Sequence, residues 1–152
     1  MEGRFSSFTV LIAKISREIR RIKTEEMAEL SLKSPHVSCL YYLYTQGSMT
    51  VRELCDICDE DKAAISRSLE YLEECGYIVR DHADGRRYKA PLVLTEGGRE
   101  IAERVTEKIE RVLGEVGQGL SDEDRATLYT GLRLISEDLE AIGAKYAKKR
   151  KK

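Results

Sequence analysis

The sequence predicts a mainly α-helical protein with one small β-hairpin, and three observations support this prediction. Apolar residues recur at intervals of three and four along most of the 152 residues, which is the spacing of helices that bury one face. Residues that favour helix ends separate these stretches into individual helices. Two short runs of β-forming residues, 78–80 and 90–94, enclose the turn sequence Asp84-Gly85. The chain is therefore expected to contain several helices and a single hairpin.

Composition limits the class of protein. A hydrophobic content of 41% suits one globular domain with helical extensions, so residues 1–152 are expected to form a single functional chain. No run of about 18 apolar residues is present, and the N-terminus lacks the pattern of a signal peptide, so we expect a cytoplasmic protein without a membrane partner. Four cysteines are too few and too scattered for a secreted disulfide scaffold.

Charge is distributed unevenly along the chain. The formal net charge is −1, and the last five residues, KKRKK, are all basic, so the remainder of the chain carries −6. An acidic body weakens non-specific DNA binding, and any DNA binding must depend on local basic clusters. The basic tail, 147–152, is expected to be disordered, and it adds either attraction to phosphates or only solubility.

Both ends of the chain carry heptad-like apolar seams. Each seam could pack on its own domain, but a seam at both ends favours pairing with a second copy of the chain. We therefore predict dimerisation helices at 4–30 and 96–146, and in the second range we expect Thr95 to cap the first helix and Ser121 to cap the next. The N-terminal seam consists of Phe5, Phe8, Ile12, Ile15, Ile19 and Ile22, and the C-terminal seam of Leu128, Leu132, Ile135, Leu139, Ile142 and Tyr146.

A second helix is expected to open at Ser34-Pro35, with Ser34 as the N-cap, and to stop at Gly47. Tyr41 and Tyr42 on this helix could line a ligand pocket, although aromatic residues at helical spacing are more often simple core. His36 in its first turn is interpreted as a surface or capping histidine.

Two further helices follow in quick succession. Thr50 and Glu53 form a capping box that opens a short helix, and Asp61 can cap a longer one that ends at Gly76. The longer helix is expected to bury Ile65, Leu69 and Leu72. Its opposite side carries Lys62, Ala63, Ala64, Ser66 and Arg67, followed by Glu70 and Tyr71.

The exposed side of this longer helix suits a docking surface. Small residues near its N-terminus allow the backbone to approach a partner closely, and the first-turn amides favour a phosphate. These residues are therefore predicted to enter the major groove of DNA.

The loop of the hairpin is basic and contains Asp84, Arg86 and Arg87. A basic loop is usually a solvated hairpin tip. Because this loop comes directly after a candidate reading helix, we interpret it as a wing whose arginines contact the minor groove or phosphates. Asp84 is expected to orient a wing arginine, or Arg80. Residues 34–95 are thus predicted to form a winged helix-turn-helix module.

These segments together resemble the MarR family of bacterial and archaeal transcription regulators. The resemblance rests on TVRELCDIC and DKAAISRSLEYLEECGYIVR as the two reading helices, and on DGRR followed by PLVLTEGG as the wing and the start of the next helix. The family pattern commonly lacks Gly85 and has a Gly-apolar pair in place of Asp59-Glu60. The resemblance implies a homodimer with intertwined terminal helices that reads a palindrome in double-stranded DNA, most often as a repressor. It also implies release by a small-molecule effector or by thiol oxidation.

The sequence allows three alternative interpretations, and each has evidence against it. Cys55 and Cys58 could form a redox pair or half of a metal site, but no second pair at matching spacing is present and both lie inside a helix, which favours small core residues. We expect no metal and no cofactor.

An enzyme is not expected, because the sequence lacks a phosphate loop, a catalytic triad and paired histidines. A protein–protein adaptor without specific DNA binding is favoured by the acidic body and by Glu70, Glu73 and Glu74, and disfavoured by the arginines.

Overall fold

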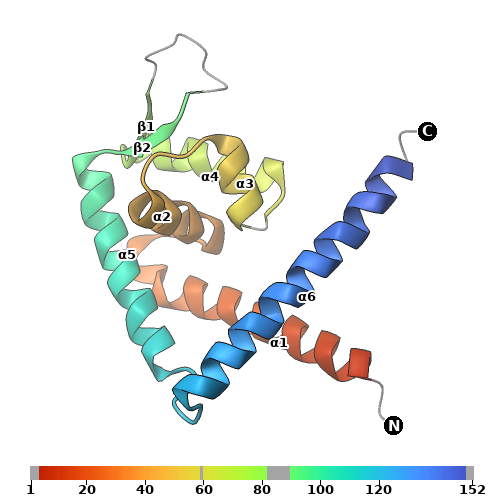
Figure 1. The fold of residues 1–152 in the computed structure, drawn as a ribbon. Coiled ribbons are helices and arrows are strands. Elements are labelled where there is room, and N and C mark those ends of the chain that lie inside the picture. The colour runs from red at the N-terminus through yellow and green to blue at the C-terminus, as the bar shows by residue number, and fades with distance from the viewer. Residues whose placement is uncertain (1–3, 59, 82–89, 150–152) are drawn as a thin grey trace. The chain divides into compact units, whose positions relative to one another are not determined.

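The computed structural model describes residues 4–58, 60–81 and 90–149, which form helices and one small antiparallel sheet (Figure 1). The chain divides into two compact units, Met1–Arg111 and Val112–Lys152, which are described separately. The elements are α1 (Arg4–Glu26), the 3-10 helix η1 (Ala28–Leu30), α2 (Ser34–Gln46), α3 (Val51–Cys58), α4 (Lys62–Glu74), β1 (Ile78–Arg80), β2 (Leu92–Leu94), α5 (Glu96–Glu115) and α6 (Asp122–Lys149). The mainly α-helical fold with a small β-hairpin confirms the predicted class.

The core of the first unit lies between α2, α3, α4 and the sheet. The predicted stripe of Ile65, Leu69 and Leu72 on α4 is completely buried, which confirms that face of the helix. The residues that pack with the stripe come from every neighbouring element, and they are Met27, Leu32, Val37, Leu40, Leu54, Ile78, Leu92 and Val105. One apolar core therefore fixes the orientation of α4 within this unit.

Three predicted helix starts are confirmed by their hydrogen bonds. The Glu53 amide donates to Thr50 Oγ1 at 3.3 Å, and the Thr50 amide donates to Glu53 Oε2 at 2.7 Å. The Ala64 amide donates to Asp61 Oδ1 at 2.8 Å at the start of α4. Thr95 caps α5 through a 2.9 Å bond from the Gly98 amide to its Oγ1. Each of these helices begins where its cap predicts.

The start of α2 differs from the prediction by one residue. Lys33, and not Ser34, is the N-cap residue, and Ser34 already belongs to the first turn. The reason is the buried His36, whose Nδ1 accepts the Lys33 amide at 3.1 Å. The His36 ring therefore satisfies the Lys33 amide, which a cap at Ser34 would have left to solvent.

The sheet is built on β2. Ile78, Val79 and Arg80 pair with Leu94, Val93 and Leu92 in antiparallel register. On its other side, Leu92 exchanges two backbone bonds with Met49, at 2.7 and 3.2 Å, which adds an isolated bridge that was not predicted. The loop before α3 is thereby joined to the strand that follows the wing.

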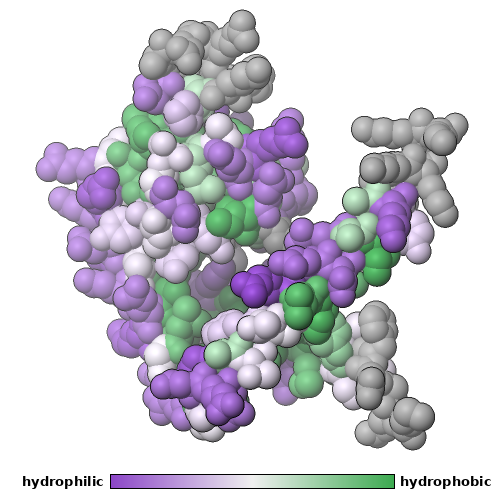
Figure 2. Space-filling model, in the orientation of Figure 1, coloured by the Kyte–Doolittle hydropathy of each residue, from purple (hydrophilic) through white to green (hydrophobic). Residues whose placement is uncertain are grey.

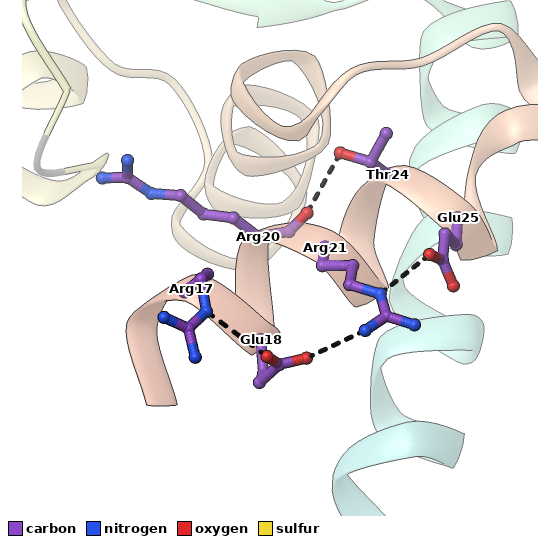
Figure 3. A network of polar contacts seen from close by, with 6 residues as sticks. All are labelled: Arg17, Glu18, Arg20, Arg21, Thr24 and Glu25. Atoms are coloured by element: carbon purple, nitrogen blue, oxygen red, sulfur yellow. Dashed lines mark hydrogen bonds and ion pairs between the residues drawn. The ribbon is translucent and has the colours of Figure 1, made fainter. Parts of the chain in front are cut away.

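Helix α1 has a polar side held by its own ion pairs (Figure 3). Arg21 contacts Glu25 at 3.0 Å and Glu18 at 3.5 Å, and Arg17 contacts Glu18 at 3.5 Å. The four isoleucines of the predicted apolar seam are exposed in the single chain, with Ile15 53% and Ile19 44% accessible. Exposed ion pairs of this kind add little to the stability of a helix. The seam therefore leaves a large apolar area of α1 facing water.

Within the second unit, α6 shows the same property. Ser121 caps the helix through a 3.1 Å bond from the Asp124 amide, as predicted. The predicted seam is largely exposed, and apolar patches are visible between polar ones along the surface of α6 (Figure 2).

None of the helices in the described ranges combines the length and the apolar character that a membrane-spanning segment needs.

Candidate nucleic-acid interface

The outer side of α4 holds all five residues that were predicted to read DNA. Lys62, Ala63 and Arg67 are exposed, and Ala64 and Ser66 are half-buried. On the inner side, Ser68 donates to the Ala64 carbonyl at 2.9 Å, so this polar residue is satisfied within the core. The first two turns of α4 thus present small side chains with one arginine among them, on a helix whose opposite face is fixed.

Tyr71 does not belong to this outer side, which corrects the prediction. Its ring stacks on His36 with centroids 4.4 Å apart and planes 10° apart, and its hydroxyl donates to the Ser31 carbonyl at 3.1 Å. Ser31 has a left-handed backbone with φ 56°, between η1 and α2. The second half of α4 is therefore attached to the segment that connects α1 with α2. Sequence spacing placed Tyr71 outside because the stacking partner is 35 residues away.

The acidic residues of α4 do not form one surface. Glu73 binds Arg80 of β1 at 2.8 Å, and these side chains are only 27% and 16% exposed. Glu70 and Glu74 are exposed. Glu73 therefore holds the end of α4 to the sheet, and the ion pair described for Arg80 is with this residue.

The wing residues Asp84, Arg86 and Arg87 lie outside the described residues. Their predicted roles, including the orientation of an arginine by Asp84, stay predictions. What is described is their base, where the Asp81 amide donates to the Pro91 carbonyl at 2.8 Å. This bond extends the pairing of β1 and β2 toward the wing. Residues 82–89 therefore connect two strands that are paired up to Asp81 and Pro91.

Tyr41 and Tyr42 are both half-buried on α2, and their rings meet edge to face with centroids 5.3 Å apart. Burial, together with the nearby Cys58 and Tyr41, raises the pKa of Tyr42 above its ordinary value. A contribution of either residue to ligand binding stays a prediction.

Cys55 and Cys58 lie one turn apart on α3 and both pack against the apolar core. A side-chain interaction with Cys39 of α2 lowers the pKa of Cys58, and burial opposes it. All four cysteines are free thiols. Over the described ranges, no group of three or more His, Cys, Asp or Glu side chains is placed to hold a metal ion. The interaction with Cys39 was missed from the sequence because 19 residues separate the two cysteines.

Comparisons with known proteins identify this module. Residues 30–87, which include α2, α3, α4 and β1, match a family model described as MarR family. The fold also superposes on that of NMB1585, a MarR family regulator from Neisseria meningitidis, with a TM-score of 0.80, 22% identity, and coverage of 94% of this chain and 98% of the other. The module is thus similar to the MarR family, and the chain shares the fold of a solved MarR family regulator.

Two further proteins are similar to this chain over most of its length. The HTH-type transcriptional regulator YfiV of Bacillus subtilis is 28% identical over 134 residues, which cover 86% of this chain and 82% of the relative. A putative MarR family transcriptional regulator from Listeria monocytogenes, solved in complex with a 26mer DNA, superposes with a TM-score of 0.78 and 21% identity over 91% of this chain and 90% of the other. The chain is thus similar over most of its length to proteins described as transcriptional regulators.

Proposed function

We propose that this chain is a homodimeric, sequence-specific DNA-binding regulator, most often a repressor, and that its dimer reads a palindromic operator. The observation that supports DNA reading best is helix α4. Its apolar stripe is buried, its start is capped by Asp61, and its exposed first turns carry Lys62, Ala63 and Arg67. Ala63 and the neighbouring Ala64 stand where an ordinary surface helix would present long charged side chains.

Arg67 is the residue proposed to read a base. An arginine that donates two hydrogen bonds to a guanine contributes about 1–3 kcal/mol of discrimination between bases. Ala63 and Ser66 let the helix backbone approach the groove, and Lys62 contacts a phosphate. The similarity to the Listeria regulator, which was solved in complex with a 26mer DNA, supports binding to duplex DNA. Arg86 and Arg87 are proposed to contact the neighbouring backbone or minor groove.

The proposed dimer follows from the exposed seams of α1 and α6. Heptad seams that stay exposed in the single chain are stabilised when they pack against an equivalent surface. A two-fold dimer places two copies of α4 one helical turn of DNA apart, and the operator then has matching half-sites. A small-molecule effector that changes this spacing would release the DNA, and Tyr41 and Tyr42 are the proposed lining of its site.

Fluorescence anisotropy tests DNA binding directly. Purified protein is titrated against labelled DNA from upstream of its own gene and against an unrelated duplex of equal length, at several salt concentrations. We expect a preference of about a thousandfold for the cognate duplex and a steep loss of affinity with salt. Equal and weak binding to both duplexes would contradict a local operator, and a genome-wide binding selection without any enriched sequence would contradict specific DNA binding.

Arg67→Ala tests the reading role, with Arg104→Ala as the matched control. Arg104 is an exposed arginine on α5, so both variants lose the same charge from the surface. Arg67→Ala should weaken operator binding by about 1–3 kcal/mol and relax the preference at one base position, whereas Arg104→Ala should change affinity little. Equal effects of the two variants would reduce Arg67 to a general charge.

The oligomeric state is tested by light scattering on Ile15→Glu. Ser16→Glu is the control, because it introduces the same charge one position away from the seam on the same helix. The first variant should shift the protein from dimer to monomer and weaken operator binding, and the second should remain a dimer. If both variants remain dimers, α1 does not contribute to the interface.

The protein–protein adaptor is the second candidate. The acidic body of the chain favours it, but the ion pair of Glu73 with Arg80 removes one of the three glutamates that supported it. Duplex binding with a steep salt dependence would exclude this candidate, and its absence on every sequence would favour it.

A further inference from the structure

The first observation is the position of the exposed residues around the axis of α4. Four of them follow one another at spacings of four, three and four residues, and they are Ala63, Arg67, Glu70 and Glu74. At about 100° per residue, these positions fall within a stripe about 60° wide. The stripe is centred opposite to the buried Ile65, Leu69 and Leu72. This outward stripe is therefore the part of α4 that projects furthest from the core of the module.

The outward stripe changes charge along its length. Its first half carries Arg67, and its second half carries Glu70 and Glu74. Over the described ranges of the chain, none of these three side chains takes part in an ion pair. Both carboxylates are exposed and are available to a partner that approaches this side of α4.

Helix stability does not explain these two carboxylates. Glu70 and Glu74 are like charges four residues apart, which slightly destabilises a helix. Glu74 also ends α4, where no basic residue is present and a negative charge opposes the helix dipole. The acidic residues that do hold α4 are Asp61, which caps it, and Glu73, which binds Arg80. Glu70 and Glu74 therefore carry a small cost in stability, which a role in recognition would offset.

A carboxylate in the major groove distinguishes cytosine from the other bases. Cytosine presents an N4 amino donor there, guanine two acceptors, thymine one acceptor and a methyl group, and adenine an N6 donor beside the N7 acceptor. A carboxylate oxygen accepts from cytosine N4, whereas the acceptors of the other three bases repel it. Glu70 lies about 4.5 Å beyond Arg67 along the helix axis, which is close to the step of about 3.4 Å between base pairs. Glu74 lies about 10.5 Å beyond Arg67.

We propose that Glu70 selects a cytosine in each half-site of the operator, by accepting a hydrogen bond from its N4 amino group. The inference rests on the proposed function, because it requires α4 to enter the major groove. Glu74, at the end of α4, only repels phosphates. Because phosphates and the other three bases repel its carboxylate, Glu70 lowers the affinity for every duplex that lacks cytosine at this position. A residue that favoured the adaptor interpretation thus becomes a determinant of DNA specificity.

A binding selection from randomised duplexes, followed by anisotropy on the selected operator, tests the proposal with the full-length protein. The wild type should bind cytosine at one position of each half-site about tenfold more tightly than the other three bases. Glu70→Ala should remove this preference and bind an unrelated duplex more tightly than the wild type does. Glu70→Gln should move the preference from cytosine to adenine, because an amide can accept from adenine N6 and donate to N7.

Glu74→Gln is the matched control, because it removes the same charge from the same stripe and should leave the selected bases unchanged. Circular dichroism of all three variants should match the wild type, since the substituted side chains are exposed. The proposal is overturned if Glu70→Ala selects the same bases as the wild type. It is also overturned if Glu70→Ala loses only the guanine preference that Arg67→Ala loses, because Glu70 would then only hold Arg67. A wild type that selects no sequence would overturn the proposed function together with this inference.

Discussion

Gly98, in the first turn of α5, is the position where the structure predicts the largest effect of a single added methyl group. A Cβ at this position would collide with the backbone carbonyl of Tyr77. That carbonyl accepts the Thr95 amide at 3.0 Å, and Thr95 Oγ1 donates to the Gly76 carbonyl at 2.6 Å. Gly98→Ala must therefore move the start of α5 away from the segment between α4 and β1.

The magnitude can be estimated from these contacts. Overpacking of a close backbone approach costs about 1–3 kcal/mol, and a lost hydrogen bond adds about 1 kcal/mol. Alanine is favoured over glycine in a helix by about 1 kcal/mol, which partly offsets this cost. The net expectation is a loss of about 1–3 kcal/mol in the free energy of unfolding, which corresponds to a fall in Tm of about 2–12 °C for a chain of this size.

Gly97→Ala is the matched control, because it adds the same methyl group one residue earlier and meets no atom within 4 Å. It should be neutral or stabilise the protein by up to about 1 kcal/mol, since it reduces the freedom of the unfolded chain. Urea denaturation compares the free energy of unfolding of the two variants. Both are measured at one protein concentration, because the apparent stability of an oligomer depends on concentration. If Gly98→Ala is as stable as Gly97→Ala, the contact between α5 and Tyr77 does not limit this position.

Two further predictions concern the attachments of α4. Burial lowers the pKa of His36 below its ordinary value of 6.5, and the positive charge of Lys33 acts in the same direction. The unfolded chain then binds the proton first, so this contribution to stability is complete above pH 6.5 and decreases as the pH falls toward the lower folded-state pKa. Denaturation of the wild type and of His36→Gln across this range should show a weaker pH dependence in the variant, and parallel curves would contradict it. Glu73→Gln should weaken the ion pair with Arg80, with a coupling energy of about 1 kcal/mol in a double-mutant cycle, whereas Glu74→Gln should show none.

Local sequence signals predicted much of this fold because their partners are close in the chain. The caps at Thr50, Asp61, Thr95 and Ser121 each bind an amide three residues ahead, so a short window contains both partners. The apolar stripe of α4 follows the helical period directly. The residues proposed to read DNA were assigned to the exposed side of α4 for the same reason, because the side opposite to a buried stripe faces solvent.

Most of the features that the sequence did not predict join distant residues. Met49 bridges to Leu92, and Tyr71 stacks on His36. Periodicity assigns a residue to a side of its helix, but it contains no information about which element covers that side. Tyr71 was therefore assigned to the solvent side, although α2 and the segment before it pack there.

The backbone bridge between Met49 and Leu92 has a consequence for how the reading segment can change. The 28 residues between Met49 and Ile78 begin and end beside the same strand, β2, because Met49 pairs with Leu92 and Ile78 pairs with Leu94. A segment whose two ends pair with the same strand forms a closed loop. Doubling the length of a closed loop costs only about 0.6 kcal/mol. Insertions between α3 and α4 can therefore be accommodated, whereas a foreign segment must keep the buried faces of both helices, because Leu54, Ile65 and Leu69 belong to the core.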